Sequence, residues 1–450
     1  MTERKGFTSR LGFILAAAAA AIGIGALWRF PPLVVEYGGG TFLLLYLLMT
    51  FTLGLVLLIT EIAIGRKTGQ SALLSFSSLN KKWGFLGILS IIVAGLILPY
   101  YSVIGGWVMN YGALYITGNE SPALNPDFFQ TFISDPVIPV IWTIIFLVIT
   151  AGILLFGVTK GIQRFSTIIL PLLIVVMIGL SIYCISLPGG LDGLAHYFIP
   201  DFSKLSVSAV LEALGMTFFS LCVASGAMVT YGSYLSKKEN IEKSAFSMVL
   251  FSAGVTILAG LLIVPAFFSF SGGDTSIIQS GTGLLFTQMP LIFETMPFGT
   301  AIGAVFFICV FFAALTSSIA LFEVLTSALI DRFRLSRIKA VGIVFAGALI
   351  LALVVNFGYS IWSFISIGRL HILEIMDSLS GNILMPIVAL LTIIFVGWII
   401  KGNTSAISEE VESSGRFASK KFYRVMIRYI APVCLAVILC FMTIKTFLSI

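Results

Sequence analysis

The sequence predicts an all-α membrane protein whose helices cross the bilayer eleven times. Hydrophobic residues make up 58% of the 450 residues and charged residues only 10%, against roughly 25% charged residues in a typical soluble domain. Because so few charged side chains cannot cover a water-facing surface, the composition argues against a soluble enzyme. At about 20 apolar residues per span, the length accommodates a single bundle of about eleven helices.

Long apolar runs give the positions of these helices. Segments such as 42–59 and 168–182 are apolar on every face. Transmembrane strands would alternate in polarity, so a β-barrel is rejected. The expected helices cover residues 11–35, 41–65, 85–117, 137–157, 165–187, 207–235, 243–270, 299–330, 338–357, 373–400 and 425–447.

Basic residues predict the orientation of the bundle. All but four of the 26 lysines and arginines lie on one side of the expected helices, the exceptions being Arg29, Lys204, Arg369 and Lys445. By the positive-inside rule, the N-terminus lies in the cytoplasm and the C-terminus outside, as an odd number of crossings requires. The expected location is therefore the plasma (inner) membrane, in a multi-pass arrangement.

Two of the expected spans contain small residues in series near their middle. The first has Gly23-Ile24-Gly25 and the sixth has Ala224-Ser225-Gly226. Close helix packing explains either segment alone. Non-helical backbone at membrane depth is tolerated only where protein or a watery cavity satisfies its polar groups. Because the two segments are an odd five crossings apart, they favour inverted five-helix repeats with matching broken helices and a binding site between them.

A broken helix offers binding groups of both signs. Free N–H groups that begin one half-helix receive a carboxylate, and free carbonyls that end the other receive a cation or an ammonium. The breaks therefore predict an amino acid or a similar small solute, moved with a monovalent cation. Thr316 and Ser317 lie mid-span and either bond back to their own helix or bind sodium. Zinc or copper would want His or Cys ligands, and the only histidines are His196 and His371.

Seven short motifs occur in an order that is specific, although each is weak alone. They are Ser9-Arg10-Leu11-Gly12-Phe13, Gly23-x-Gly25-x-x-Trp28-Arg29-Phe30-Pro31, Glu36-x-Gly38-Gly39-Gly40-x-Phe42, Glu61-x-x-x-Gly65-Arg66, Tyr100-Tyr101, Gly281-x-Gly283-Leu284-x-Phe286 and Leu315-Thr316-Ser317-Ser318-Ile319-Ala320. Over essentially its whole length the chain resembles the neurotransmitter:sodium symporter family, especially its eleven-helix bacterial amino-acid transporters. The resemblance implies one transporter domain over residues 1–450, with repeats at about 7–190 and 203–401 and an eleventh helix at about 424–448.

The resemblance also implies binding residues for sodium, the expected coupling ion, and for a small-molecule substrate. Sodium would be bound by the carbonyls of Ala19, Ile22 and Ala313 and the hydroxyls of Thr316 and Ser317. A substrate carboxylate would meet the N–H groups of Ile24 and Gly25 and the Tyr101 hydroxyl, and an ammonium the carbonyls of Ala21, Phe219 and Ser220. The substrate side chain would contact Ile97, Phe219, Cys222, Ser225, Ser317 and Leu321.

Two features of the site limit the range of expected substrates. Gly23 stands where amine transporters of the family carry an aspartate, which implies a substrate that brings its own carboxylate. Ser225 stands where relatives often carry a bulky aromatic residue, which favours a hydrophobic or aromatic amino acid. The implied gates are Arg29 with Asp377 on the outer side, and Arg4 with Asp331 on the inner side, beside Phe7 and Tyr234.

Departures from the family pattern predict the ion requirement. A second sodium site normally uses two asparagine side chains, but this chain has Ala26 and Ser252 there, although Ser220 keeps a hydroxyl. At the family's chloride site Tyr46 is present, whereas Met216 replaces a glutamine and Thr256 stands where relatives carry serine or an acid. We therefore expect one sodium ion and no chloride.

Other functions stay open at this point. A proton-coupled or uncoupled carrier of a related solute would use Glu61 or Glu323 as the titrating group. A channel would need rings of similar pore-lining residues. No HExxH or GxSxG motif supplies catalytic residues for an enzyme, and nothing indicates a nucleic-acid partner. The polar segment 403–419 is expected to be a solvated cytoplasmic loop, and residues 271–297 an outer cap over the entry path.

Overall fold

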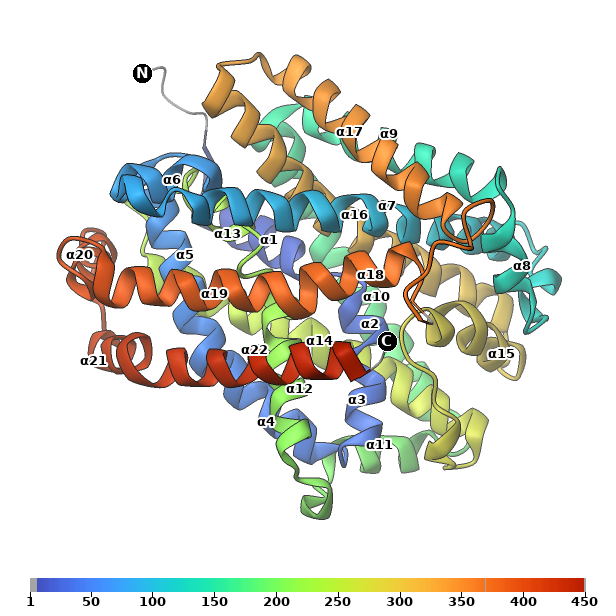
Figure 1. Cartoon of the computed structure of the whole chain (residues 1–450). Coiled ribbons are helices and arrows are strands. Elements are labelled where there is room, and N and C mark those ends of the chain that lie inside the picture. Colours follow the sequence, from blue (N-terminus) through green and yellow to red (C-terminus); the bar gives the residue numbers. More distant parts are fainter. Residues whose placement is uncertain (1–5, 369, 449–450) are drawn as a thin grey trace.

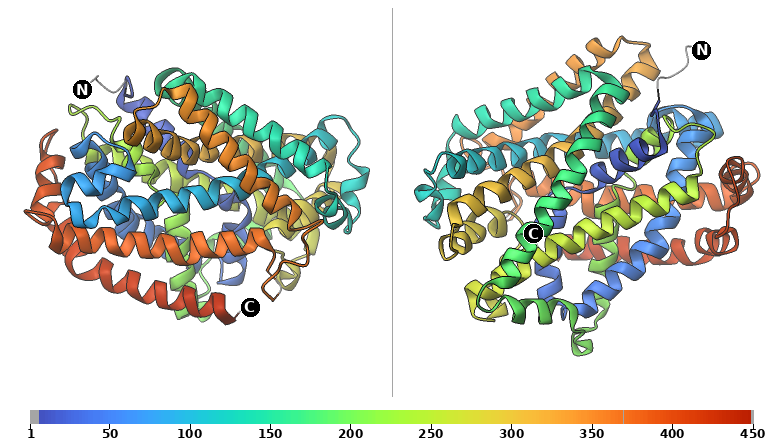
Figure 2. Two further views of the ribbon diagram at one scale, coloured as in Figure 1. Left: turned by 45° about the horizontal axis from the view of Figure 1, so that its top comes forward. Right: turned by 180° about the vertical axis from the view of Figure 1, so that it is seen from behind.

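The protein is described here by a computed structural model, which covers residues 6–368 and 370–448. In these residues the secondary structure is helical apart from two isolated β-bridges. Long helices lie side by side across the view in Figure 1, and Figure 2 shows the same bundle from two other directions. The predicted all-α class is therefore confirmed.

Nine continuous helical segments of the described residues are long and apolar enough to cross a membrane. Several combine α-helices with short η turns, which are π-helical except for the 3₁₀ turn η2 (Lys81–Trp83). They are Gly40–Thr68 (α4, η1 and α5), Lys81–Ile116 (η2 and α7), Ile138–Leu155 (α9), Val158–Ser186 (η4 and α10), Ile241–Ser271 (α14), Gly299–Phe333 (α16), Arg337–Phe357 (α17), Ile372–Ile399 (α18, η8, α19 and η9) and Lys420–Phe441 (α21, η10 and most of α22).

The first span is broken where the sequence predicts. α1 (Arg10–Ala21) is followed by α2 (Gly25–Trp28) and α3 (Phe30–Glu36), and the two parts meet at a bend of 49°. Counting this bent pair as one span gives ten within the described residues. The Ser9 hydroxyl starts α1 by accepting the Gly12 N–H at 3.0 Å.

The sixth span is broken as well. α12 (Val207–Leu221) and α13 (Ala227–Gly232) are each too short to span the bilayer alone. The helix ends because Cys222 adopts a left-handed conformation at φ 52°, followed by Ala224 at 65° and Gly226 at 79°. The count of eleven crossings and the division into repeats stay predictions. α1 contacts both α12 and α13, so the two breaks lie close together in the bundle.

Short helices cover the two ends of the bundle. α20 (Thr404–Glu412) and α21 (Lys420–Val425) lie at one end in Figure 1, and α8 (Phe128–Ser134) and α15 (Met289–Glu294) at the other. The basic residues assign the end with α20 to the cytoplasm, so we call it the predicted cytoplasmic face and the opposite end the predicted outer face. α6 (Ala72–Leu79) and α11 (Gly190–Phe198) complete the fold.

One expectation about the loops is wrong. Segment 403–419 is not a fully solvated loop, because it contains α20, and Ile407, Glu410 and Val411 of that helix are buried. Its three glutamates made the segment look uniformly polar. Glu409 and Glu412 are exposed, whereas Glu410 points into the protein toward Arg66 of α5. Sequence polarity did not reveal this buried partner.

Candidate functional site

A small cavity of about 30 Å³ lies where the two broken spans meet α7, α16 and α19. Of the residues predicted to bind the substrate, all but Ile24, Gly25 and Ser220 line it. The lining residues are Ala21, Gly23, Ile97, Tyr101, Phe219, Cys222, Ser225, Ser317, Leu321 and Met385. The fold thus brings together positions from five helical segments that are far apart in the sequence.

The break in the first span is held by α7. The Ile24 N–H donates a hydrogen bond to the Tyr101 hydroxyl oxygen at 2.7 Å. A Cβ atom at Gly23 would lie 2.6 Å from that hydroxyl oxygen and 3.1 Å from Ser317 Oγ. A Cβ at Gly25 would overlap the Phe219 ring. The absence of side chains at both glycines therefore keeps this part of the cavity open.

The end of α1 has carbonyl groups without their helical partners. The Gly23 N–H donates to the Ala21 carbonyl at 3.1 Å and the Ile24 N–H to Tyr101, so neither reaches the carbonyl four residues before it. Those carbonyls belong to Ala19 and Ala20. Such carbonyls at a helix end need another partner, which a cation can supply.

α16 contributes the hydroxyls of Ser317 and Thr316, of which the Ser317 hydroxyl reaches the end of α1. The Ser317 hydroxyl donates to the Ala20 carbonyl at 2.9 Å and reaches the Ile22 carbonyl at 3.4 Å. The Thr316 hydroxyl bonds back to its own helix, donating to the Phe312 and Ala313 carbonyls at 3.1 Å each. The predicted sodium ligands thus lie around the contact between α1 and α16. Uncharged hydroxyl and carbonyl oxygens fit a monovalent hard cation.

The break in the sixth span is held by α5. Glu61 is buried, and one of its carboxylate oxygens accepts the Ala224 N–H at 2.6 Å. Left-handed backbone at a residue such as Ala224 costs about 1–2 kcal/mol, so this hydrogen bond offsets strain. The turn it holds directs Cys222 and Ser225 into the cavity wall. Sequence reasoning had identified Glu61 as a motif residue and a candidate titrating group, but not as the partner of this turn.

The predicted second sodium site, with Ser220 and Ser252, adjoins the predicted chloride site, with Tyr46 and Thr256, and their hydroxyls bond to one another and to the backbone. The Ser252 hydroxyl donates to the Ser220 carbonyl, and the Tyr46 hydroxyl donates to Ser220 Oγ at 3.0 Å. The Thr256 hydroxyl donates to the Ser252 carbonyl at 2.9 Å. Ala26 is buried and adds no ligand atom. These polar groups satisfy one another without an ion.

A second cavity of about 300 Å³ opens on the predicted outer side of the first. Phe219 and Tyr101 line both cavities and so form the wall between them. Arg29 and Asp377 face this larger cavity from different helices. Among the described residues they form no direct ion pair, and Asp377 instead accepts a hydrogen bond from the Tyr100 hydroxyl at 2.9 Å.

The predicted cytoplasmic side of the site is packed with aromatic rings. The rings of Phe7 and Tyr234 meet edge to face at 6.2 Å, and the Phe7 N–H donates to the Tyr234 carbonyl at 3.1 Å. Asp331 accepts the Ser71 N–H at 2.6 Å. Arg4, its predicted partner, lies outside the described residues. Glu323 pairs with Arg337 at 2.6 Å and accepts the Tyr234 hydroxyl, also at 2.6 Å.

Met385 is a cavity residue that sequence reasoning missed. It begins α19 (Met385–Ile394), directly after the π-helical turn η8 (Ser378–Leu384). Such a turn shifts the face that the following residues present. Within a uniformly apolar run, no local signal distinguished Met385 from its neighbours.

Comparisons with known proteins agree with this geometry. The model of the "Sodium:neurotransmitter symporter family" matches residues 4–120 and 134–449. An uncharacterized sodium-dependent transporter of Bacillus subtilis, YhdH, is 33% identical over the full length of both chains. The rat sodium- and chloride-dependent GABA transporter 2 is 25% identical over 74% of this chain and 62% of its own length.

A solved structure extends the likeness to the fold. The crystal structure of MhsT in complex with L-phenylalanine superposes with a TM-score of 0.86 at 34% sequence identity, covering 97% of this chain and 99% of that one. The family match across nearly the whole chain and this structural likeness point to a multi-pass membrane transporter that depends on sodium, and not to an enzyme. The chain therefore belongs to the sodium:neurotransmitter symporter family.

Proposed function

We propose that this protein is a secondary active symporter that couples inward sodium movement to the uptake of an amino acid. One sodium ion and no chloride take part in each cycle. The observation that carries the proposal is the contrast between two ligand sets. The predicted sodium site keeps both of its hydroxyls, Thr316 and Ser317, beside carbonyls of α16 and α1. The second site lacks both amide side chains, because Ala26 and Ser252 stand there, and the Ser252 hydroxyl is bonded to the Ser220 carbonyl.

A hydrophobic or aromatic amino acid is the proposed substrate. Its carboxylate and ammonium lie at the two ends of the broken first span, near the Tyr101 hydroxyl and the Ala21 carbonyl. Its side chain lies against Ile97, Leu321 and Met385, which give the cavity an apolar wall. The bound L-phenylalanine of MhsT, a structure 34% identical to this chain, supports this substrate class.

Uptake proceeds by alternating access to the small cavity. The larger outer cavity reaches Phe219 and Tyr101, while Phe7 packed on Tyr234 closes the other side. This arrangement supports a state poised to receive sodium and substrate from the predicted outer face. Closure of Phe219 and Tyr101 over the substrate would precede separation of Phe7 from Tyr234. The N-terminus is cytoplasmic and the C-terminus outside in this proposal.

Uptake into proteoliposomes tests the proposal. Purified protein is expected to accumulate labelled phenylalanine, or another apolar amino acid, when an inward sodium gradient is imposed. Because one ion site is intact, uptake should rise with sodium at a Hill coefficient near one and be unchanged when gluconate replaces chloride. A Hill coefficient near two, or a chloride requirement, would contradict the proposed stoichiometry.

Proton coupling through Glu61 is the alternative favoured by one observation. The second carboxylate oxygen of Glu61 is buried and has no hydrogen-bond partner among the described residues. Glu61→Gln keeps an acceptor for the Ala224 N–H but cannot titrate. Under the sodium proposal this variant should retain sodium-driven uptake within about fivefold, since the net value of one hydrogen bond is about 1 kcal/mol.

The same measurement separates the two mechanisms. A proton-coupled carrier would lose concentrative uptake in Glu61→Gln and would respond to an imposed proton gradient in the absence of sodium. Glu323 is a weaker candidate for the titrating group. Both of its carboxylate oxygens already accept hydrogen bonds, from Arg337 and from the Tyr234 hydroxyl.

A further inference from the structure

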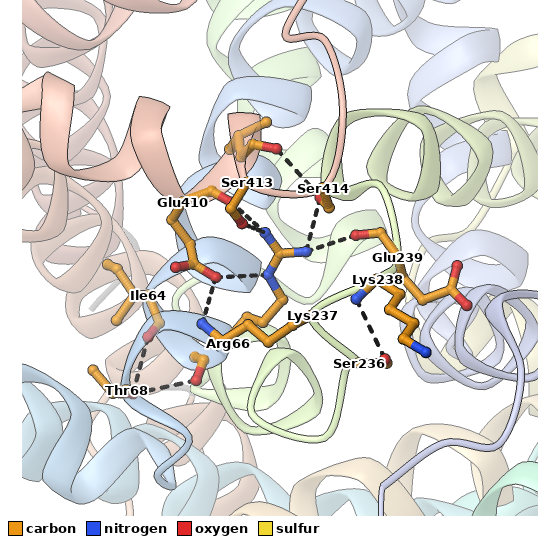
Figure 3. A network of polar contacts seen from close by, with 12 residues as sticks. Ile64, Arg66, Thr68, Ser236, Lys237, Lys238, Glu239, Glu410, Ser413 and Ser414 are labelled. Carbon is orange, nitrogen blue, oxygen red and sulfur yellow. Dashed lines mark hydrogen bonds and ion pairs between the residues drawn. The ribbon is translucent and has the colours of Figure 1, made fainter.

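A buried cation lies outside the candidate site, at the predicted cytoplasmic end of α5 (Leu55–Thr68). The Arg66 side chain is 1% exposed, and all five of its guanidinium N–H groups have an acceptor (Figure 3). The acceptors are Glu410 Oε1 at 2.7 Å, the Glu239 carbonyl at 2.6 Å, Ser414 Oγ at 3.0 Å, Ser413 Oγ at 3.2 Å and the Glu410 carbonyl.

These contacts join three separate segments of the chain. Arg66 belongs to α5, and Glu239 belongs to the turn that follows α13. Glu410 and the two serines belong to residues 402–419, which contain α20 and which we call the strap. Lys237 of the same turn also donates to Glu410 Oε1, at 2.8 Å. Removing one partner of a buried ion pair is much more costly than losing an exposed one.

The strap is attached at its other end as well. Glu242, in the first turn of α14, accepts the N–H groups of Ala418 and Ser419 at 2.8 Å each and the Ser419 hydroxyl at 2.6 Å. Both attachments lie near the turn between α13 and α14, since Lys237 and Glu239 belong to that turn and Glu242 lies in the first turn of α14. The strap is therefore fastened to the chain just beyond the inner half of the broken sixth span.

α13 and α5 are themselves in backbone contact. A Cβ at Gly65 would lie 1.9 Å from the Val229 carbonyl oxygen, and one at Gly232 would lie 2.5 Å from the Ile62 carbonyl oxygen. The two glycines therefore let the two helices pack closely along their length. The strap connects this pair to α19 and α22, which pack on each other and lie on either side of it in the sequence.

The same turn reaches the aromatic packing below the cavity. Tyr234 lies between α13 and Lys237, and its carbonyl accepts the Phe7 N–H. Any movement of α13 that separates Tyr234 from Phe7 must carry the strap along or break the contacts of Arg66. The cavity residues Cys222 and Ser225 lie just before α13.

We propose that Arg66 and Glu410 are positioning residues that form a latch. The latch holds α13 on the predicted cytoplasmic face while the cavity is accessible from the other side, and it loosens when the cavity opens inward. This inference rests on the alternating access proposed above. It assigns the strap a part in the transport cycle, although the strap contacts neither the substrate nor the sodium ligands.

Hydrogen–deuterium exchange of the full-length protein tests the latch. Glu410→Gln removes the charge but keeps the shape. Glu412→Gln makes the same change two residues away in the same strap, where the carboxylate pairs with exposed Lys420 at 2.8 Å. Glu410→Gln is expected to speed exchange about tenfold in residues 227–240 and 6–9, because a buried pair holds that region closed. Glu412→Gln should leave both peptides unchanged.

The effect of sodium on hydrogen–deuterium exchange distinguishes a latch from a purely structural contact, because a purely structural contact would not alter that effect. In the wild type, saturating sodium should slow exchange in residues 6–9, and Glu410→Gln should weaken this protection. If the faster exchange is confined to residues 402–419, or if both glutamine variants behave alike, the latch is refuted. Should Glu410→Gln fail to fold, the double variant Ser413→Ala/Ser414→Ala removes two acceptors and leaves the ion pair, with about threefold faster exchange expected.

Failure of the latch and failure of the proposed function give different results. If the protein is not a sodium-coupled carrier, sodium will change neither uptake nor exchange in the wild type. The difference between Glu410→Gln and Glu412→Gln at residues 6–9 would persist in that case. If only the latch is wrong, sodium-dependent uptake and protection remain and the two variants are indistinguishable.

Discussion

Alanine at both Thr316 and Ser317 is expected to abolish the sodium dependence of substrate binding and uptake. The two hydroxyls lie beside the carbonyls of Ala313 and Ala20, and they supply the side-chain oxygens of the predicted sodium site. A hydrogen bond or similar contact to a charged group is worth about 1.5–3 kcal/mol. Loss of both should weaken sodium binding by about 100-fold or more. Sodium titration of the thermal stability of purified protein, with and without amino acid, measures this effect.

Ser318→Ala is the matched control for this prediction. Ser318 is the next residue of α16 and is equally buried, but its hydroxyl has no hydrogen-bond partner among the described residues. Its replacement removes the same atom and should leave the sodium titration unchanged. If the double variant titrates like the wild type, or if Ser318→Ala is equally impaired, sodium is not bound at this contact between α1 and α16.

Gly23→Ala is expected to lower the affinity for the amino acid at least tenfold. The added methyl group would lie 2.6 Å from the Tyr101 hydroxyl oxygen and 3.1 Å from Ser317 Oγ. It would occupy the space proposed for the substrate carboxylate and disturb the Tyr101 contact with the Ile24 N–H. Calorimetric or scintillation-proximity binding of phenylalanine at saturating sodium measures the loss.

Gly95→Ala separates this steric effect from a general effect on helix packing. Gly95 lies in the middle of α7 (Phe85–Ile116), and a Cβ there would meet nothing within 4 Å. Alanine is also the better helix former. Unimpaired binding is therefore expected for Gly95→Ala. Normal affinity in Gly23→Ala would show that the substrate does not approach the break in the first span.

Much of the fold was predictable because each membrane span requires a continuous run of apolar residues, which is visible in the sequence. The runs from 41 to 65 and from 299 to 330 correspond to Gly40–Thr68 and Gly299–Phe333. The breaks were predictable for a related reason. Small residues at 23–25 and 224–226 are conspicuous within apolar helices, and the helices are interrupted there. The family resemblance then supplied the binding roles, which composition and periodicity alone do not contain.

The environment of a residue could not be predicted from its neighbours in the sequence where a distant part of the chain sets it. Met385 faces the cavity because a π-helical turn precedes it. Glu410 is buried because it accepts hydrogen bonds from Arg66, which lies far earlier in the chain at the end of α5. Its neighbours Glu409 and Glu412 share its chemistry and are exposed. Nothing in the polar segment distinguishes the three glutamates.

The sequence by itself determined the membrane class, the positions of most spans and of their interruptions, and the oxygen-rich character of the predicted ion site. These properties depend on local hydrophobicity and on the absence of side chains, which a single chain displays directly. Only the tertiary structure decided which carbonyls of α1 lack partners, which hydroxyls satisfy one another, and which charges are buried. These properties depend on contacts between helices that are distant in the sequence. A buried donor or acceptor is almost always hydrogen-bonded, and only the fold determines which group is its partner.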